Sequence, residues 1–129
     1  MWRILIAEDV FEARQLLVES LRELAQCDVV VTGKEAVNAY NVSLKNEKKY
    51  DLILLDIAMP EMDGMEVLHK IRESEEDAGI LFGKGIPIIM VTAFNKPMVS
   101  AFGKGCDDYI VKPIDPDILI EKVKEKLEK

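Results

Sequence analysis

Short apolar runs alternate with amphipathic segments from one end of the chain to the other. All the runs but the last are nearly unbroken stretches of hydrophobic residues, which is typical of strands that helices cover on both faces. The five runs are Arg3 to Ala7, Asp28 to Val31, Leu52 to Leu55, Ile86 to Val91 and Tyr109 to Val111. The alternation predicts an α/β fold of the (βα)5 kind, a doubly wound, flavodoxin-like three-layer arrangement with a parallel five-stranded sheet in the middle.

Between the runs, apolar residues recur every three or four positions, which places them on one face of a helix. These stripes are Val10, Ala13, Leu17, Leu21 and Leu24; Ala36, Tyr40 and Leu44; and Leu119, Val123 and Leu127. A short fourth helix is predicted to open at Asn95 and Pro97, to present Met98, Ala101 and Phe102, and to end at Gly103 or Gly105. Three pairs have the spacing of helix caps: Thr32 with Glu35, Asp63 with Glu66, and Asp115 before Pro116.

The length of 129 residues and the mass of 14.6 kDa suit one globular core, and residues 1–129 are predicted to form one domain. The one irregular stretch, Ser74 to Gly85, is acidic and then glycine-bearing, and we expect a solvated loop there. Its second half, Gly79 to Gly85, resembles a Walker A loop. It is one residue short between its glycines and has Gly85 where Ser or Thr is required, so nucleotide binding is disfavoured.

Composition narrows the class of protein further. Seventeen Lys and Arg against twenty-four Asp and Glu give a net charge of −7, which argues against direct binding to nucleic acid or to an anionic membrane. No apolar stretch approaches the ~20 residues that span a bilayer, and charged residues follow the start too soon for a signal peptide. We expect a cytoplasmic protein in which Cys27 and Cys106 are reduced, at least half-buried thiols and the single histidine, His69, lies on the surface.

Polar residues follow the last hydrophobe of four predicted strands. They are Glu8 and Asp9 after the first strand, Asp56 after the third, Thr92 after the fourth and Lys112 after the fifth. The most frequent strand order for such a sheet is 2-1-3-4-5, and its ligand crevice lies at the carboxyl ends of strands 1 and 3. The five side chains are therefore predicted to meet at one rim of the sheet.

Three carboxylates at one rim need a counter-charge, because a pair ~4 Å apart repels by about 4 kcal/mol at an effective dielectric constant near 20. A divalent cation together with Lys112 would balance them. Oxygen ligands without His or thiolate favour Mg²⁺, with Mn²⁺ also suitable, and we expect Asp9 and Asp56 to bind directly and Glu8 through a water. With Lys112 and the Thr92 hydroxyl, such a site has the groups needed for phosphoryl transfer to an aspartate.

Four segments, ILIAED, LILLDIAMPEMDG, IPIIMVTA and DDYIVKP, occur in an order and at a spacing that resemble the receiver domain of two-component response regulators. The resemblance covers the whole chain. It implies that Asp56 is the phosphoacceptor, that Glu8 and Asp9 are the acidic pair, and that the carbonyl of Ala58 is a further Mg²⁺ ligand.

The same resemblance implies a conformational switch. Thr92 would be the switch hydroxyl, Lys112 the phosphoryl-binding lysine in a cis bond to Pro113, and Tyr109 the aromatic residue that moves inward. Ala58 and Phe94 are apolar where relatives most often have polar side chains. Because both positions border the path of an attacking water, we expect slow hydrolysis of the phosphoaspartate.

These observations predict a signalling domain and not a metabolic enzyme, although it catalyses its own phosphotransfer and slow autodephosphorylation. A sensor histidine kinase or a histidine phosphotransfer protein would donate the phosphoryl group. The downstream partner, or a second copy in a phosphorylation-dependent dimer, would bind the face of helix 4, strand 5 and helix 5, where Met98, Phe102 and Tyr109 lie. Because the sequence ends at Lys129, we expect a single-domain regulator, although a fragment of a longer one would look the same.

Two other functions fit parts of the pattern. A Mg²⁺-dependent phosphohydrolase with an aspartate nucleophile would normally have a second Asp two residues after a nucleophile at Asp9, where Phe11 stands. A phosphorylation-independent interaction module would not need the complete set of rim residues.

Overall fold

The structure is a computed structural model, and it describes residues 1–93 and 105–128. The predicted fourth helix, with Met98 and Phe102, and the predicted water-path residue Phe94 lie outside the described residues. The elements are β1 (Trp2–Ala7), α1 (Phe11–Leu21), β2 (Ala25–Val30), α2 (Gly33–Leu44), β3 (Leu52–Asp56), α3 (Gly64–Asp77), β4 (Ile88–Thr92), β5 (Asp108–Val111) and α5 (Pro116–Leu127).

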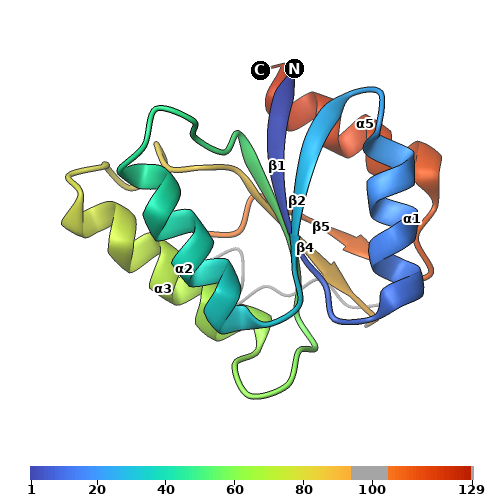
Figure 1. The fold of residues 1–129 in the computed structure, drawn as a ribbon, viewed down its shortest axis with the longest axis horizontal. Helices are drawn as coiled ribbons and strands as arrows, with labels where there is room; N and C mark the ends of the chain where they lie inside the picture. Colours follow the sequence, from blue (N-terminus) through green and yellow to red (C-terminus); the bar gives the residue numbers. More distant parts are fainter. Residues whose placement is uncertain (94–104, 129) are drawn as a thin grey trace.

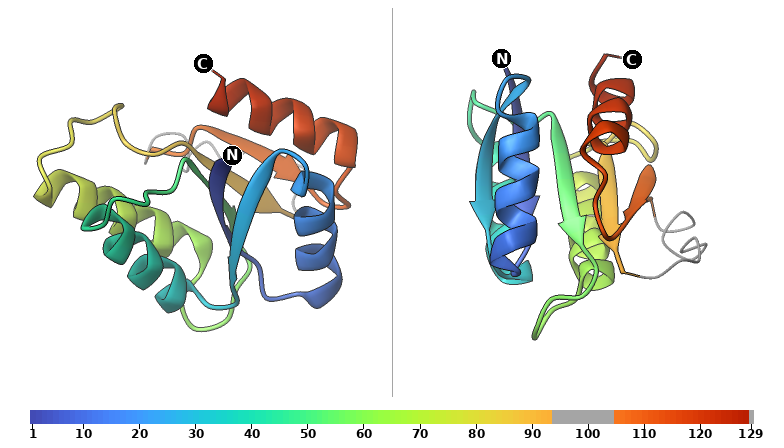
Figure 2. Two further views of the ribbon diagram at one scale, coloured as in Figure 1. Left: turned by 45° about the horizontal axis from the view of Figure 1, so that its top comes forward. Right: turned by 90° about the vertical axis from the view of Figure 1, so that its right-hand side faces the viewer.

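The five strands form one parallel sheet in the order β2-β1-β3-β4-β5, as the sequence predicts. Helices α1 and α5 cover one face of the sheet, and α2 and α3 cover the other (Figure 1). The view along the sheet in Figure 2 shows the helices on either side of the strands and the two termini at the same end of the molecule. The predicted doubly wound, three-layer fold is confirmed.

Each face of the sheet has its own hydrophobic core, because successive side chains of a strand point to opposite faces. On β1, Ile4 and Ile6 belong to the core under α1 and α5, whereas Leu5 and Ala7 belong to the core under α2 and α3. All residues of β3 and β4 are buried, which explains why these runs contain no alternation of polar and apolar residues.

The predicted helix caps are present. Thr32 and Glu35 form a complete capping box, and the side chain of Asp63 accepts a hydrogen bond from the amide of Glu66. Asp115 caps α5, with Pro116 in its first turn. These caps anchor the starts of three helices at the end of the sheet where the predicted site residues lie.

Some predictions about local structure are wrong. The second strand is Ala25–Val30 and not Asp28 to Val31. Leu24, predicted on the first helix, lies beyond the end of that helix at Leu21. The stretch from Ser74 is not a solvated loop at its start, because α3 continues to Asp77 and Glu75 is only 3% exposed. The carboxylate of Glu75 has three hydrogen-bond donors: Arg72 on the same helix, and Tyr40 and Ile86 from other segments. These contacts offset the cost of burying a charged side chain in an acidic stretch.

Other predictions about single residues agree with the structure. Cys27 is partly buried and Cys106 is buried, both as free thiols, and His69 is exposed. Burial raises the pKa of Cys27 to about 11, with Asp28 adding to the effect. Among the described residues, no helix has the length and apolar character needed to cross a membrane.

Candidate functional site

The carboxyl ends of the strands bring the predicted rim residues to one edge of the sheet. Asp56 and Thr92 are the last residues of β3 and β4, and Glu8 and Lys112 follow β1 and β5 directly. Backbone hydrogen bonds continue past the strand ends and hold these positions. The amide of Glu8 donates to Val30 O at 3.1 Å, and the amide of Lys112 donates to Thr92 O at 2.7 Å.

Glu8, Asp9 and Asp56 form a compact acidic cluster. One carboxylate oxygen from each residue lies within 4.8 Å of the others, and Glu8 and Asp56 are 0% and 2% exposed. Three buried oxygens, Glu8 Oε1, Asp9 Oδ1 and Asp56 Oδ2, accept no hydrogen bond from the described residues. Buried carboxylate oxygens without donors are costly unless a cation satisfies them.

Lys112 supplies part of that positive charge. Its Nζ lies 2.9 Å from Glu8 Oε1 and 3.6 Å from Asp56 Oδ2, distances of ion pairs without well-directed hydrogen bonds. Burial by itself lowers the pKa of Lys112, but the close contact with Glu8 and the charge of Asp56 outweigh it and raise the pKa. One ammonium group beside three carboxylates leaves the cluster with excess negative charge.

The pKa of Asp56 reflects first its burial and then its charged neighbours. Burial raises it to about 7, and the neighbouring Glu8 adds to the rise, while Lys112 and the amide of Ala58 act in the opposite direction. An oxygen-only donor set with unsatisfied oxygens matches the preference of Mg²⁺ or Mn²⁺. The residues at the rim therefore fit the predicted metal.

The loop after β3 wraps closely around Asp56. The amide of Ala58 donates to Asp56 Oδ1 at 3.1 Å, and the amide of Gly64 donates to Ile57 O at 2.9 Å. A Cβ on Gly64 would lie 2.6 Å from the carbonyl oxygen of Asp56, so only glycine allows α3 to start this near the site. Sequence reasoning passed over Gly64, although its place at the end of the DIAMPEMDG segment was the available signal.

Arg14 is a second site residue that sequence reasoning missed. From the first turns of α1, its guanidinium donates to the backbone carbonyls of Glu8 and Asp9 at 3.1 and 3.4 Å, and it lies 5.5 Å from the ring centroid of Phe11. These contacts hold the loop that presents the acidic pair. Because they use backbone oxygens, no pairing of residue types in the sequence signals them.

The two predicted switch residues occupy different depths of the sheet. Thr92 is 1% exposed at the rim, level with Val111 of the neighbouring strand. Tyr109 lies two residues further from the rim, opposite Met90, and the ammonium of Lys122 is 5.4 Å from its ring centroid. The Lys112–Pro113 peptide bond is cis, as the resemblance implies.

A doubly wound sheet with buried acids, a hydroxyl and a lysine at its carboxyl edge defines a class of phosphoryl-handling α/β domains. The model of the response regulator receiver domain matches residues 4–124, and the chain therefore belongs to the receiver domain family of two-component response regulators.

Among curated proteins, the chain is similar to the transcriptional regulatory protein ResD of Bacillus subtilis, with 40% identity over 128 residues, 97% of this chain and 48% of ResD. It is 39% identical to SrrA of Staphylococcus aureus over 127 residues, 96% of this chain and 47% of SrrA. The chain thus spans about half the length of these relatives.

Solved structures agree on the fold. The BeF3-activated receiver domain of DrrB has a TM-score of 0.79 and 25% identity, with 100% of this chain and 99% of that chain covered. The receiver domain of Ssk1, solved with the histidine phosphotransfer protein Ypd1 of Saccharomyces cerevisiae, belongs to a structure that matches with a TM-score of 0.84 and 29% identity over 98% of this chain and 88% of that chain.

Proposed function

We propose that Asp56 accepts a phosphoryl group from a phosphohistidine and that the modified chain changes its affinity for a partner protein. The observation that carries this proposal is the buried Asp56 carboxylate, whose Oδ2 lacks a hydrogen-bond donor among the described residues and lies 3.6 Å from Lys112 Nζ. In the reaction, a carboxylate oxygen attacks phosphorus and the P–N bond to the histidine breaks. The bond's electron pair returns to the imidazole, which takes up a proton from solvent.

In this proposal, each rim residue stabilises part of the negative charge on the transferred phosphoryl group. Lys112 pairs with one phosphoryl oxygen, and the Thr92 hydroxyl donates to another. Mg²⁺ or Mn²⁺ would be held by Asp9, Asp56 and the Ala58 carbonyl directly and by Glu8 through a water. When bound, the metal neutralises charge on the phosphoryl group and on the carboxylates. No side chain has to act as a general base, because bound Mg²⁺ together with Lys112 would keep the Asp56 carboxylate ionised, although its pKa without metal is about 7.

The donor in this proposal is a sensor histidine kinase or a histidine phosphotransfer protein in the cytoplasm. The similarity to the Ssk1 receiver, which was solved with such a phosphotransfer protein, supports it. We place residues 1–129 in one receiver domain, with the output surface on β5 and α5 around Tyr109 and with Thr92 and Tyr109 as the switch. That surface is also where we place a phosphorylation-dependent dimer.

The experiment is incubation of the chain with Mg²⁺ and acetyl phosphate, followed by intact mass measurement. The wild type should gain one phosphoryl group, and Asp56→Asn should gain none. Asp63→Asn is a matched control, because Asn also caps a helix and the position is exposed. A wild type without the added mass, or equal labelling of Asp56→Asn, would refute the assignment of Asp56.

A further inference from the structure

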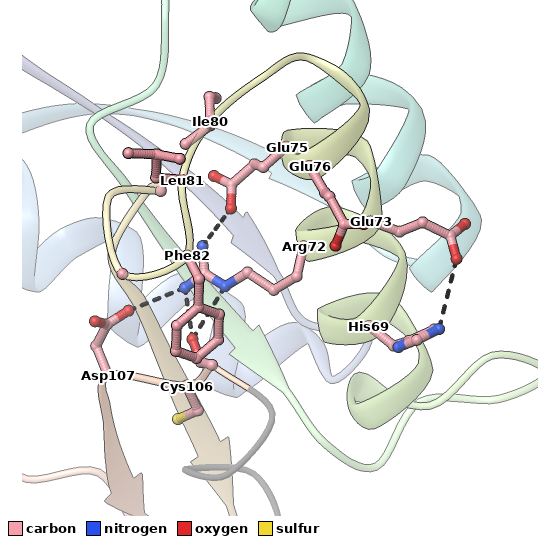
Figure 3. A pocket seen from close by; sticks show the side chains of 13 residues that line it. His69, Arg72, Glu73, Glu75, Glu76, Ile80, Leu81, Phe82, Cys106 and Asp107 are labelled. Atoms are coloured by element: carbon pink, nitrogen blue, oxygen red, sulfur yellow. Dashed lines mark hydrogen bonds and ion pairs between the residues drawn. The ribbon is translucent and has the colours of Figure 1, made fainter.

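A second polar region lies at the opposite end of the sheet. A cavity of about 490 Å³ opens between the C-terminal half of α3, the segment that leads into β4, and the segment that leads into β5 (Figure 3). Both strands run from this cavity toward the rim that carries Asp56 and Thr92. With five residues in β4 and about 3.3 Å per residue, the two regions lie roughly 16 Å apart along the strand.

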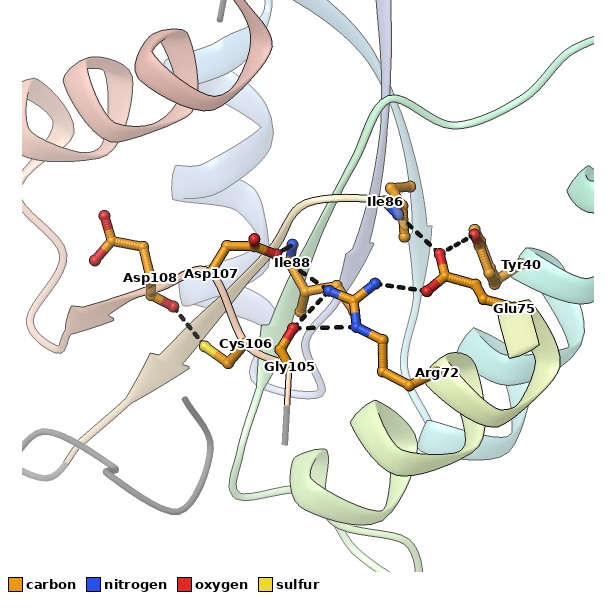
Figure 4. Close-up of polar contacts among 9 residues, drawn as sticks. All are labelled: Tyr40, Arg72, Glu75, Ile86, Ile88, Gly105, Cys106, Asp107 and Asp108. Carbon is orange, nitrogen blue, oxygen red and sulfur yellow. Dashed lines mark hydrogen bonds and ion pairs between the residues drawn. The ribbon is translucent and has the colours of Figure 1, made fainter. Parts of the chain in front are cut away.

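The floor of the cavity is rigid. Glu75 Oε2 accepts hydrogen bonds from the Tyr40 hydroxyl at 2.6 Å and from the Ile86 amide at 2.8 Å, and Glu75 Oε1 accepts one from Arg72 at 2.7 Å (Figure 4). A Cβ on Gly85 would collide with the Glu75 carboxylate, so glycine lets the chain close over it. The Glu75 carboxylate is therefore bound within the protein and is not available to a ligand.

Arg72 is the only lysine or arginine among the described residues that line the cavity, and its charge is already paired. Besides Glu75, its guanidinium donates to Gly105 O at 2.6 and 3.0 Å and to Asp107 Oδ2 at 3.1 Å. Asp107 Oδ2 also accepts from the Ile88 amide at 2.8 Å. The network joins α3 to the starts of β4 and β5, and it leaves Arg72 without charge to neutralise other acids.

Two exposed acids, Glu73 and Glu76, line the cavity beyond this network. Glu73 lies 3.6 Å from His69, which is a cation only when protonated, and Glu76 has no ion-pair partner among the described residues. With Glu75 and Asp107, the lining residues within the described part of the chain have four carboxylates against one guanidinium. Cations are favoured here, and phosphate-bearing ligands are disfavoured.

The remaining wall is apolar and faces solvent. Leu81 is 73% exposed and Phe82 is 86% exposed, and among the large apolar side chains of the described residues only Met1 is as exposed as these two. Two glycines with positive φ, Gly79 at 83° and Gly83 at 85°, bracket these residues and have open space around them. An aromatic and an aliphatic side chain beside an acidic cavity have no role in the hydrophobic cores of this fold.

We propose that this cavity and its apolar wall bind a partner protein through a peptide segment in which Arg or Lys alternates with aromatic or aliphatic residues. The cationic side chain enters beside Glu73 and Glu76, and the apolar side chains cover Leu81 and Phe82. The acidic lining favours a cationic side chain in the ligand. Because Leu81 and Phe82 point outward and do not enclose a space, they suit contact with a protein surface better than with a small molecule. Because the surface lies at the amino ends of β4 and β5, the partner binds without occupying the phosphoacceptor rim.

The test uses the ¹⁵N-labelled Asp56→Asn chain, so that its outcome does not depend on phosphorylation. The probe is the peptide Ac-Trp-Arg-Leu-Arg-NH2, titrated by amide chemical shifts. We expect saturable shifts confined to residues 69–86 and 105–107. Glu73→Gln with Glu76→Gln should weaken binding about tenfold, and Leu81→Ser with Phe82→Ser should weaken it at least as much.

Two controls separate this surface from general attraction to an acidic protein. Glu121→Gln with Glu125→Gln removes two exposed acids of α5 and should leave the affinity unchanged. A peptide with Ser in place of Trp and Leu should bind about tenfold more weakly. The proposal is overturned by the absence of saturable shifts at millimolar peptide or by shifts centred on the rim. It is also overturned if Glu73→Gln with Glu76→Gln, or Leu81→Ser with Phe82→Ser, binds the peptide as tightly as the wild type.

Discussion

Each end of the sheet has a buried carboxylate, but the two ends differ in how far hydrogen bonds satisfy it. The rim cluster consists of Glu8, Asp9, Asp56 and Lys112, and the base cluster consists of Tyr40, Arg72, Glu75 and Asp107. From the described residues, Asp56, which is 2% exposed, receives one hydrogen bond, whereas Glu75, which is 3% exposed, receives three. The rim is left electrostatically incomplete and ready for a ligand, and the base is complete and stabilises the fold.

Glu75→Ala should give the largest effect, because it breaks the complete cluster. The change leaves the Tyr40 hydroxyl, the Ile86 amide and one face of Arg72 without their partner. We expect the free energy of unfolding in urea to fall by about 3–5 kcal/mol. Glu76→Ala, an exposed neighbour on the same helix, is the control and should change it by at most about 0.5 kcal/mol. Equal losses in the two variants would show that the base cluster has no special part in stability.

The base cluster also marks the limit of what could be predicted from the sequence. The strands, the caps and the rim could be predicted because they depend on local patterns: apolar runs, cap spacing, and the first polar residue after each strand. The order of the strands followed from the most frequent order of such sheets. Glu75 depends on Tyr40, which lies 35 residues away, and Arg72 depends on Gly105, which lies 33 residues away. The acidic stretch around Glu75 has the composition of a solvated loop, and only the folded arrangement supplies its donors.

Mg²⁺ should stabilise the wild type through the rim alone. Its binding satisfies the oxygens of Glu8, Asp9 and Asp56 that lack hydrogen-bond donors, so the folded state gains about 2.7 kcal/mol at a metal concentration 100 times the Kd. Melting temperature as a function of Mg²⁺ concentration measures this gain. Asp9→Asn should reduce it strongly, and the pair Glu73→Gln with Glu76→Gln should leave it unchanged. A melting temperature that does not move with Mg²⁺ would contradict the metal assignment.

Asp56→Asn should stabilise the chain in EDTA at pH 8, the reverse of the change expected at Glu75. The pKa of Asp56 is raised to about 7 from 3.8, first by burial and then by Glu8, so the folded state holds this proton more tightly than the unfolded state does. Wild-type stability from this group is therefore retained below about pH 4 and is lost as pH rises through about 7. Above pH 7 the neutral Asn avoids that loss, and we expect a gain of about 1–2 kcal/mol.

Urea unfolding at pH 5 and pH 8 measures this difference. The advantage of Asp56→Asn should be larger at pH 8, whereas the Glu75→Ala loss should persist at both values because Glu75 has its donors at either pH. A variant that is less stable than the wild type at pH 8 would show that Asp56 is satisfied in the folded state and that the contrast between the clusters is wrong.

Ala58→Asn should have the smallest effect and should act on the chemistry of the rim without changing stability. Ala58 is exposed and contributes its amide to Asp56 Oδ1, a contact that Asn retains. A polar side chain there can orient water toward the phosphoaspartate, so we expect dephosphorylation about three to ten times faster, a barrier change of about 0.7–1.4 kcal/mol. Mass spectra taken at intervals after removal of acetyl phosphate give the rate. Ala58→Val, which adds bulk without polarity, should not accelerate it, and an equal rate for Ala58→Asn and the wild type would mean that the apolar side chain at this position does not slow hydrolysis.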